Sequence, residues 1–445
     1  MLREAALKLY RGSVLTLLLT LSWWGARAEA QDVPPPDAGG TPPRPAAPPA
    51  RPSPEQAAPW YDLSRLPFLP IPSVGTDPNG GTTVGILPVW LHTDENHQIN
   101  RIIAPDLTHN PYFGWGVHGR LFEYPSQDTQ WSIVAGVKQR VERTFDMEYQ
   151  LGRQREGNFT STTNANFDID GTPRFFGVGN KTRLSAQTNY TAQVALFQEQ
   201  LGWNLTHNWQ LLYTIRKRIV KTSPGTLQQV PSIETRYRHV PGVLDTESEL
   251  LNRYSIVYDT RDELTAPRHG ARVVVYGGVA SRGGIFNTSM YTETGGDGRA
   301  YWPIRPDTVV AMHASIRYLP SAQRPLPFWA LSSIGGDTSE VGGEQPLRGY
   351  GAGRFTDRNA FSASAEVRHI FWGFDAEGTH VDLEVSPFVD LGHVWGHTSN
   401  FPGSNLHKVG GVGFRAIARP SVVGYVDVGY GDEGAAVFTG LNYPF

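Results

Sequence analysis

From about Gly80 to the end of the chain, strand-length runs alternate between apolar and polar residues. Clusters of Gly, Pro, Asn and Asp separate these runs, which are roughly nine to fifteen residues long. A period of two, rather than the 3.6 of a helix, predicts β-strands that are apolar on one face only. In one such run, the first face holds Val381, Leu383, Val385, Pro387, Val389 and Leu391, and the second holds Asp382, Glu384, Ser386, Phe388, Asp390 and Gly392.

A soluble β-sandwich would also alternate, but three features favour an all-β barrel that spans a membrane. The runs are near the roughly 9–11 residues that a tilted strand needs to cross a bilayer. Their polar faces carry many charged residues and glycines, as the wet interior of a barrel would. Aromatic residues gather near the ends of runs, as in the girdles of membrane barrels: Trp90, Trp131, Trp209, Tyr301, Trp302, Phe371, Trp372 and Trp395.

The runs predict a 16-stranded antiparallel transmembrane β-barrel, an even number as expected when both ends of a bacterial barrel lie in the periplasm. The loop after the eleventh strand then lies on the extracellular side. Residues 144–169 are counted as one strand, although they could also form a hairpin. The strands are expected near residues 82–92, 98–108, 114–124, 130–141, 144–169, 188–204, 208–220, 251–260, 271–281, 286–302, 307–319, 359–372, 380–396, 408–418, 421–430 and 434–445.

The N-terminal residues predict export and divide the chain into three parts. Basic residues precede an apolar run from Val14 to Trp24 that is too short to span a bilayer, and small residues near Ala28 offer a cleavage site. We therefore expect a signal peptide over 1–28, a disordered Pro/Ala-rich linker over 29–59 and an outer-membrane barrel over 60–445. An exported chain without cysteine is not a small disulfide-stapled domain.

A long glycine-rich segment from Gly335 to Gly353 separates two of the expected strands and contains Leu347-Arg348-Gly349-Tyr350. Glu366 and Asp390 lie on the polar faces of the next two strands. These positions predict a loop that folds back into the barrel, where acids of the wall hold the arginine. A surface loop with its arginine in water is the alternative, because exposed ion pairs are common and individually weak.

Four segments along the chain occur in an order that is typical of one family. Leu347-Arg348-Gly349-Tyr350 is similar to its loop motif, and Phe388 to Trp395 is similar to its strand motif two strands later. Tyr258 to Asp262 resembles its periplasmic turn, and Phe175 to Asn180 resembles a segment of its surface-antigen branch. On these motifs, residues 70–445 resemble the BamA/TamA outer-membrane assembly superfamily, which also contains the two-partner secretion transporters.

The resemblance implies a 16-stranded barrel whose long loop enters the lumen. It also implies that the motif arginine, Arg348, contacts the acid of the strand motif, Asp390, while Glu366 is a second acceptor on the neighbouring strand. The residues that carry the strand motif besides Asp390 are Phe388, Gly392 and Trp395.

The last expected strand alternates to the final residue, with Leu441, Tyr443 and Phe445 on one face. This pattern resembles the terminal signal by which outer-membrane barrels are recognised, so barrel-assembly machinery is an expected partner for insertion of this chain. Pro444 is unusual in such a signal, although proline is tolerated at a strand end or a free edge.

The expected function is assistance of protein or lipid insertion or translocation at the outer membrane of a Gram-negative-type cell, through a weak seam between the first and last strands. Outer-membrane lipids and unfolded outer-membrane proteins are the expected partners, and nothing in the charge pattern indicates nucleic acid. The family's periplasmic POTRA domains are not expected in the short Pro/Ala-rich segment before the barrel. A passive pore or structural barrel is therefore the alternative.

We expect neither an enzyme nor a bound cofactor or metal. No Gly-x-Ser-x-Gly elbow, phosphate-binding loop or His-Glu-x-x-His motif occurs. His397 and Ser399 lie close together in an expected extracellular loop, but no acid is evident that would orient them. The 13 histidines show no metal-ligand spacing.

Overall fold

The computed structural model describes residues 69–94, 99–283, 289–320, 325–336, 347–376, 379–396, 405–418, 422–441, 443 and 445. All of them belong to one compact unit, Tyr61–Phe445. The expected signal peptide and linker lie outside the described residues, and so do His397 and Ser399. Among the residues that are described, no helix is long and apolar enough to cross a membrane.

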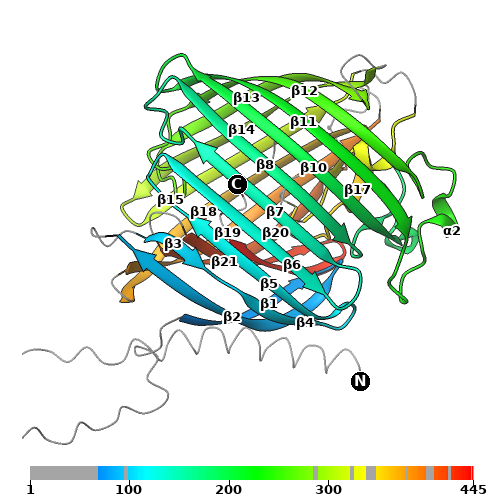
Figure 1. The fold of residues 1–445 in the computed structure, drawn as a ribbon, viewed down its shortest axis with the longest axis horizontal. Coiled ribbons are helices and arrows are strands. Elements are labelled where there is room, and N and C mark those ends of the chain that lie inside the picture. The colour runs from blue at the N-terminus through cyan, green and yellow to red at the C-terminus, as the bar shows by residue number, and fades with distance from the viewer. Residues whose placement is uncertain are drawn as a thin grey trace, which may run out of the picture. The chain divides into compact units, whose positions relative to one another are not determined.

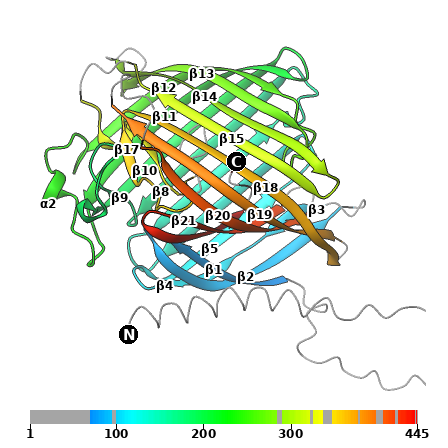
Figure 2. The ribbon, with the colours of Figure 1, turned by 180° about the vertical axis from the view of Figure 1, so that it is seen from behind.

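These residues form one large antiparallel sheet that curves into a barrel (Figures 1 and 2), which confirms the expected all-β barrel. Hairpins connect most neighbouring strands. The strands are β1 (Leu69–Asp77), β2 (Gly81–Thr93), β3 (Ile99–Ile103), β4 (Asp106–Asn110), β5 (Gly114–Glu123), β6 (Thr129–Lys138), β7 (Arg143–Leu151), β8 (Phe159–Asp170), β9 (Arg174–Phe175), β10 (Thr188–Asn204), β11 (Trp209–Pro224), β12 (Thr246–Asp259), β13 (Gly270–Arg282), β14 (Ser289–Arg305), β15 (Thr308–Tyr318), β16 (Ser332–Ile334), β17 (Phe355–Asp357), β18 (Asn359–Ala376), β19 (Thr379–Trp395), β20 (His407–Ala418), β21 (Val422–Gly431) and β22 (Gly434–Leu441).

The wall has more strands than the sequence suggests. Within the described ranges, the sheet contains 20 strands. β3 and β4 both pair with β2 and β5 and therefore count as one position in the wall. β9 has only two residues and is not counted, so the wall has eighteen strand positions. Residues 144–169 form the hairpin β7–β8 instead of one strand. β1 was not among the expected strands; it contains Pro70 and Pro72, which are tolerated in a strand at the edge of a sheet.

The first residue of β1 and the last residue of β22 lie at the same end of the barrel, which we call the terminal end. We call the other the loop end. The loop end carries the turn between β1 and β2, the short helix α2 (Glu234–Tyr237), and the short strands β16 and β17. β1 and β22 run side by side, and this boundary is called the seam below.

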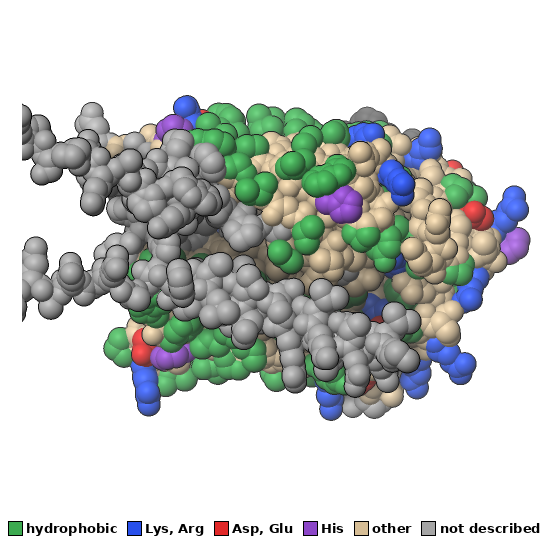
Figure 3. All heavy atoms as spheres, turned by 90° about the horizontal axis from the view of Figure 1, so that it is seen from below, with side chains coloured by type: hydrophobic (Ala, Val, Ile, Leu, Met, Phe, Trp, Pro, Cys, Tyr) green, Lys and Arg blue, Asp and Glu red, His purple; other side chains and the backbone are tan. Residues whose placement is uncertain are grey.

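The outer face of the wall is apolar, as a membrane requires. Figure 3 shows hydrophobic side chains spread over one face, with Lys and Arg gathered mainly toward the end that carries α2 in Figure 1. Trp209, Trp302 and Phe371 are exposed near strand ends, as expected for girdle residues. Tyr301 and Trp395 are instead buried, because Tyr301 faces the lumen and Trp395 lies where β17 packs on β19.

The last strand departs from its predicted course. β22 ends at Leu441, and the two described residues beyond it turn into the lumen instead of continuing the alternation. The Tyr443 hydroxyl donates to Glu384 Oε2 at 3.1 Å, and the Phe445 ring stacks on His313 with centroids 5.2 Å apart. Tyr443 and Phe445 thus pack on lumenal charged and aromatic groups instead of extending the last strand to residue 445, and Phe445 is buried.

Candidate functional site

Residues 332–336 and 347–357, the described part of the chain from β16 to β17, fold back into the barrel and are called the lumen loop. Its two short strands pair with each other at the loop end. The N–H of Leu347 donates to the carbonyl of Gly336 at 2.9 Å, and the N–H of Gly336 donates to the carbonyl of Tyr350 at 3.0 Å. Gly335 and Gly336 have φ angles of 134° and 79°, which favour glycine, so the reversal that presents Arg348 depends on this pair.

Arg348 lies at the centre of a buried network, the Arg348 cluster, which consists of Arg348, Ser364, Glu366, Phe388, Asp390 and Asp427. Its backbone N–H and its Nε each donate to Asp390 Oδ2 at 3.0 Å, and Nη2 donates to Asp390 Oδ1 at 2.7 Å. Nη1 donates to Glu366 Oε1 at 2.6 Å and to Asp427 Oδ2 at 2.9 Å. Nη2 also donates to Ser364 Oγ at 3.0 Å, so acceptors surround all three guanidinium nitrogens.

The cluster is shielded from water and tied to further charges. The side chains of Arg348, Glu366 and Asp390 are 0% exposed, and the guanidinium carbon lies 3.4 Å from the centroid of the Phe388 ring. Burial alone would lower the pKa of the Arg348 guanidinium, but the neighbouring carboxylates raise it well above its ordinary value, so the group stays charged. Glu366 also accepts from Arg415 at 2.8 Å and from Arg368 at 2.9 Å.

Glycines in the wall make room for the lumen loop. A Cβ on Gly429 of β21 would overlap the carbonyl oxygen of Arg348, and one on Gly392 of β19 would come within 2.7 Å of Ile334. A Cβ on Gly349 of the loop itself would lie 2.8 Å from the backbone nitrogen of Gly431. At Gly429 and Gly349, backbone therefore packs against backbone, which only glycine permits.

The structure brings together most residues that the sequence singles out. Leu347, Tyr350 and Phe388 belong to one buried apolar group at the loop, and Gly392 lies against it. Trp395 is buried near this group without joining the Arg348 cluster. Asp427 and Ser364 were not anticipated, although the alternation in β21 and β18 puts both on the inner face and could have identified them.

The segment Phe175 to Asn180, which had no assigned role, crosses to the lumen loop. The N–H of Gly179 donates to the carbonyl of Thr356 at 2.7 Å. Asn180 Oδ1 accepts from the N–H of Val394 at 3.0 Å, and the Phe176 ring lies under the guanidinium of Arg354 at 4.3 Å. The segment therefore covers the outer part of the loop and joins it to β19.

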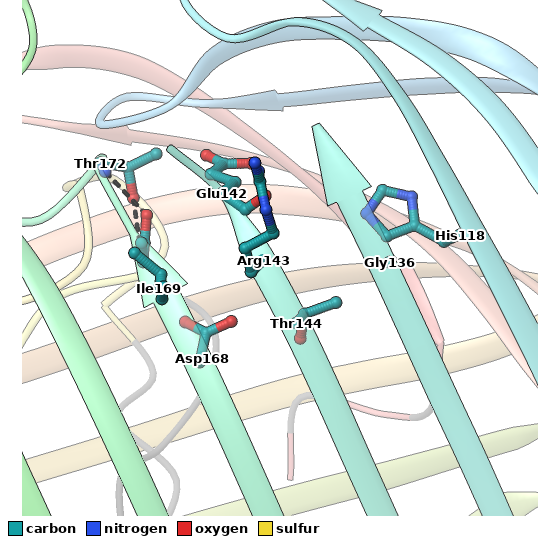
Figure 4. Close-up of a pocket in the computed structure, with 9 residues that line it drawn as sticks. His118, Gly136, Glu142, Arg143, Thr144, Asp168, Ile169 and Thr172 are labelled. Carbon is teal, nitrogen blue, oxygen red and sulfur yellow. Dashed lines mark hydrogen bonds between the residues drawn. The ribbon is translucent and has the colours of Figure 1, made fainter. Parts of the chain in front are cut away.

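A separate cavity of about 240 Å³ lies among β5 to β8 (Figure 4). Glu142, Asp168 and Asp170 contribute carboxylates and His118 an imidazole. Two of the acids are already bonded, since Asp170 accepts from the N–H and hydroxyl of Thr172 at 2.7 and 3.0 Å and Glu142 pairs with Lys138. Among the described residues, no group of three or more His, Cys, Asp or Glu side chains could hold a metal ion.

Comparison with known proteins identifies the family. The model described as the Omp85 superfamily domain matches residues 134–418, which is more than half of the chain. No curated protein matches. One similar solved structure is BamA from Haemophilus ducreyi lacking POTRA domains 1-3, with 14% identity over 84% of this chain and 74% of that chain and a TM-score of 0.47. Another is CdiB from Escherichia coli, with 12% identity over 85% of this chain and 67% of that chain and a TM-score of 0.47. CdiB from Acinetobacter baumannii is also similar, with 12% identity over 84% of this chain and 59% of that chain and a TM-score of 0.43.

The family match covers Arg348 of the lumen loop and the strands that carry Glu366 and Asp390, and it agrees with the resemblance of their motifs. The protein belongs to the Omp85 superfamily and is thus an outer-membrane β-barrel with a general role in insertion or translocation at that membrane.

Proposed function

We propose that the protein assists the insertion or translocation of protein, or of lipid, at the outer membrane, and that the seam is where this occurs. Membership of the Omp85 superfamily supports the general role. The observation that carries the proposal is an interruption of the sheet. β1 and β22 are neighbours, yet among the described residues no registered backbone pairing joins them, whereas the other neighbouring wall strands are paired.

The composition of β1 fits this role. Pro70 and Pro72 have no N–H, so neither can donate a backbone hydrogen bond to a neighbouring strand. A strand edge with unpaired backbone groups can template pairing of an incoming strand. The seam therefore combines weak closure with the chemistry needed to accept a strand of an unfolded outer-membrane protein.

A disulfide across the seam tests the proposal. The chain has no cysteine, and a Cβ on Gly75 of β1 would lie 3.3 Å from Thr439 Oγ1 of β22. This separation suits a disulfide between Gly75→Cys and Thr439→Cys. The variant is reconstituted in liposomes, and insertion of an unfolded outer-membrane protein is measured with the disulfide oxidised and reduced.

We expect the reduced variant to accelerate insertion and the oxidised one not to. A control pair, Ala195→Cys with Ile219→Cys, joins residues that already face each other in the β10–β11 ladder and should leave the rate unchanged on oxidation. Equal rates in both redox states would reject the seam as the site. No acceleration in either state, together with unchanged levels of other outer-membrane proteins after depletion, would indicate a passive or structural barrel.

A further inference from the structure

Residues 350–354 of the lumen loop contact the two hairpin turns that flank the seam at the loop end. One is the turn 78–80 between β1 and β2, and the other is the turn 432–433 between β21 and β22. These turns belong to opposite edges of the sheet, so a segment that contacts both spans the boundary where backbone pairing is missing.

On the β1 side, the contact is made by Asn79. Its Nδ2 donates to the carbonyl of Ala352 at 2.8 Å, and the side chain is buried. Arg174 Nη2 donates to the carbonyl of Asn79 at 2.7 Å and so fixes the turn from behind. A Cβ on Gly351 would overlap the Asn79 side chain, which shows how closely the loop approaches this turn.

On the β22 side, two loop residues hold the other turn. Arg354 Nε lies 2.8 and 2.9 Å from the two carboxylate oxygens of Glu433, and the Tyr350 hydroxyl accepts from the N–H of Asp432 at 3.2 Å. Arg354 is itself held firmly. Its guanidinium donates to the hydroxyl and carbonyl of Thr182 at 3.0 and 2.8 Å and stacks between Phe176 and Phe355.

We propose that residues 350–354, with Asn79 and Glu433, form a seam bridge that holds β1 and β22 together at the loop end. The bridge supplies side-chain contacts where the described residues of β1 and β22 show no registered backbone pairing. Because the same loop carries Arg348, the Arg348 cluster is the fixed point from which the bridge acts. The bridge itself does not depend on the proposed function. Only its consequence rests on that function, namely that the bridge must be released before the seam opens.

The rate of disulfide formation between Gly75→Cys and Thr439→Cys reports how often the two strands are adjacent. We expect Arg354→Ala and Asn79→Ala each to slow this rate roughly fivefold, the factor that about 1 kcal/mol makes in an equilibrium constant. Arg354→Lys should fall in between, because an ammonium lacks the planar fork that binds a carboxylate through two hydrogen bonds. The barrel fold of each variant is checked by its heat-dependent migration on gels.

Lys181→Ala is the matched control, since Lys181 is an exposed cation beside Thr182. Arg354→Ala combined with Glu433→Ala should slow disulfide formation no more than Arg354→Ala alone, if the two act as a pair. Rates in folded Arg354→Ala and Asn79→Ala that equal the Lys181→Ala rate would overturn the seam bridge. The assay contains no client protein, so a slower rate alongside absent insertion activity would support the bridge while rejecting the insertion role.

Discussion

The Arg348 cluster and the seam lie close together in one barrel, but different kinds of contact hold them together. β21, which carries Asp427 of the cluster, pairs directly with β22, which borders the seam. The cluster joins the loop to β18, β19 and β21 through buried charge-assisted hydrogen bonds. At the seam, by contrast, β1 and β22 are neighbours without registered pairing among the described residues.

This difference shows how stability can be distributed unevenly around a single sheet. Regions that must move are drawn from the least stable part of a structure. On the function proposed above, a strongly fixed loop beside a weakly closed boundary would let that boundary open without disturbing the rest of the wall. The comparison can be tested by perturbing each region in turn.

The largest effect is expected for Arg348→Ala. The substitution removes the buried ion-pair partner of Asp390, whereas Glu366 and Asp427 keep their contacts with Arg415. Removal of one partner from a buried pair typically costs about 3–5 kcal/mol. We expect the lumen loop to become sensitive to protease and single-channel conductance to rise. Arg348→Asp with Asp390→Arg should restore both in part. Unchanged conductance and unchanged cleavage would refute the stabilising role of the cluster.

A smaller effect is expected for Gly429→Ala, because its Cβ would overlap the Arg348 carbonyl. Overpacking of this kind costs about 1–3 kcal/mol. The thermal unfolding midpoint should fall and protease should cut the loop faster. Gly424→Ala is the control in the same strand, since a Cβ there meets nothing within 4 Å. Equal midpoints for the two variants would contradict close packing of the loop on β21.

Added salt should weaken the ion pair of the seam bridge more than the ion pairs of the Arg348 cluster. The Glu433 side chain is 22% exposed, whereas the ion-pair partners of Arg348 are 0% exposed. Raising the ionic strength from about 0.1 to 1 M shortens the screening length from about 10 to 3 Å. Hydrogen exchange should therefore quicken at the Asp432 N–H but not at the Arg348 N–H. Equal responses would mean that the two sites are screened alike.

The smallest effect is expected at the seam itself. Gly75→Ala adds a Cβ 3.3 Å from Thr439 Oγ1, and no registered pairing with β22 is present to be disturbed. The unfolding midpoint should stay close to that of the wild type, within the roughly 0.5 kcal/mol typical of surface substitutions. A decrease as large as that for Gly429→Ala would show that the seam is packed as tightly as the cluster.

Much of the wall could be predicted from alternation alone. Val389 is exposed on the outer face of β19, whereas Glu384, Ser386 and Asp390 are buried on the inner face, as a period of two requires. The same rule would have found Asp427. The rule failed at β1, whose prolines hide a strand, and beyond Leu441, where contacts with lumenal groups outweigh local pattern.

The sequence by itself determined the all-β barrel, the family and the presence of an arginine loop with acids on the facing wall, because these depend on local alternation and short motifs. Only the tertiary structure decided which residues meet across the barrel. Asn79 and Ala352 are 273 residues apart, and Arg354 and Glu433 are 79 apart. Such contacts depend on the closure of the whole sheet, which brings its first and last hairpins to the same loop, and no local pattern encodes that geometry.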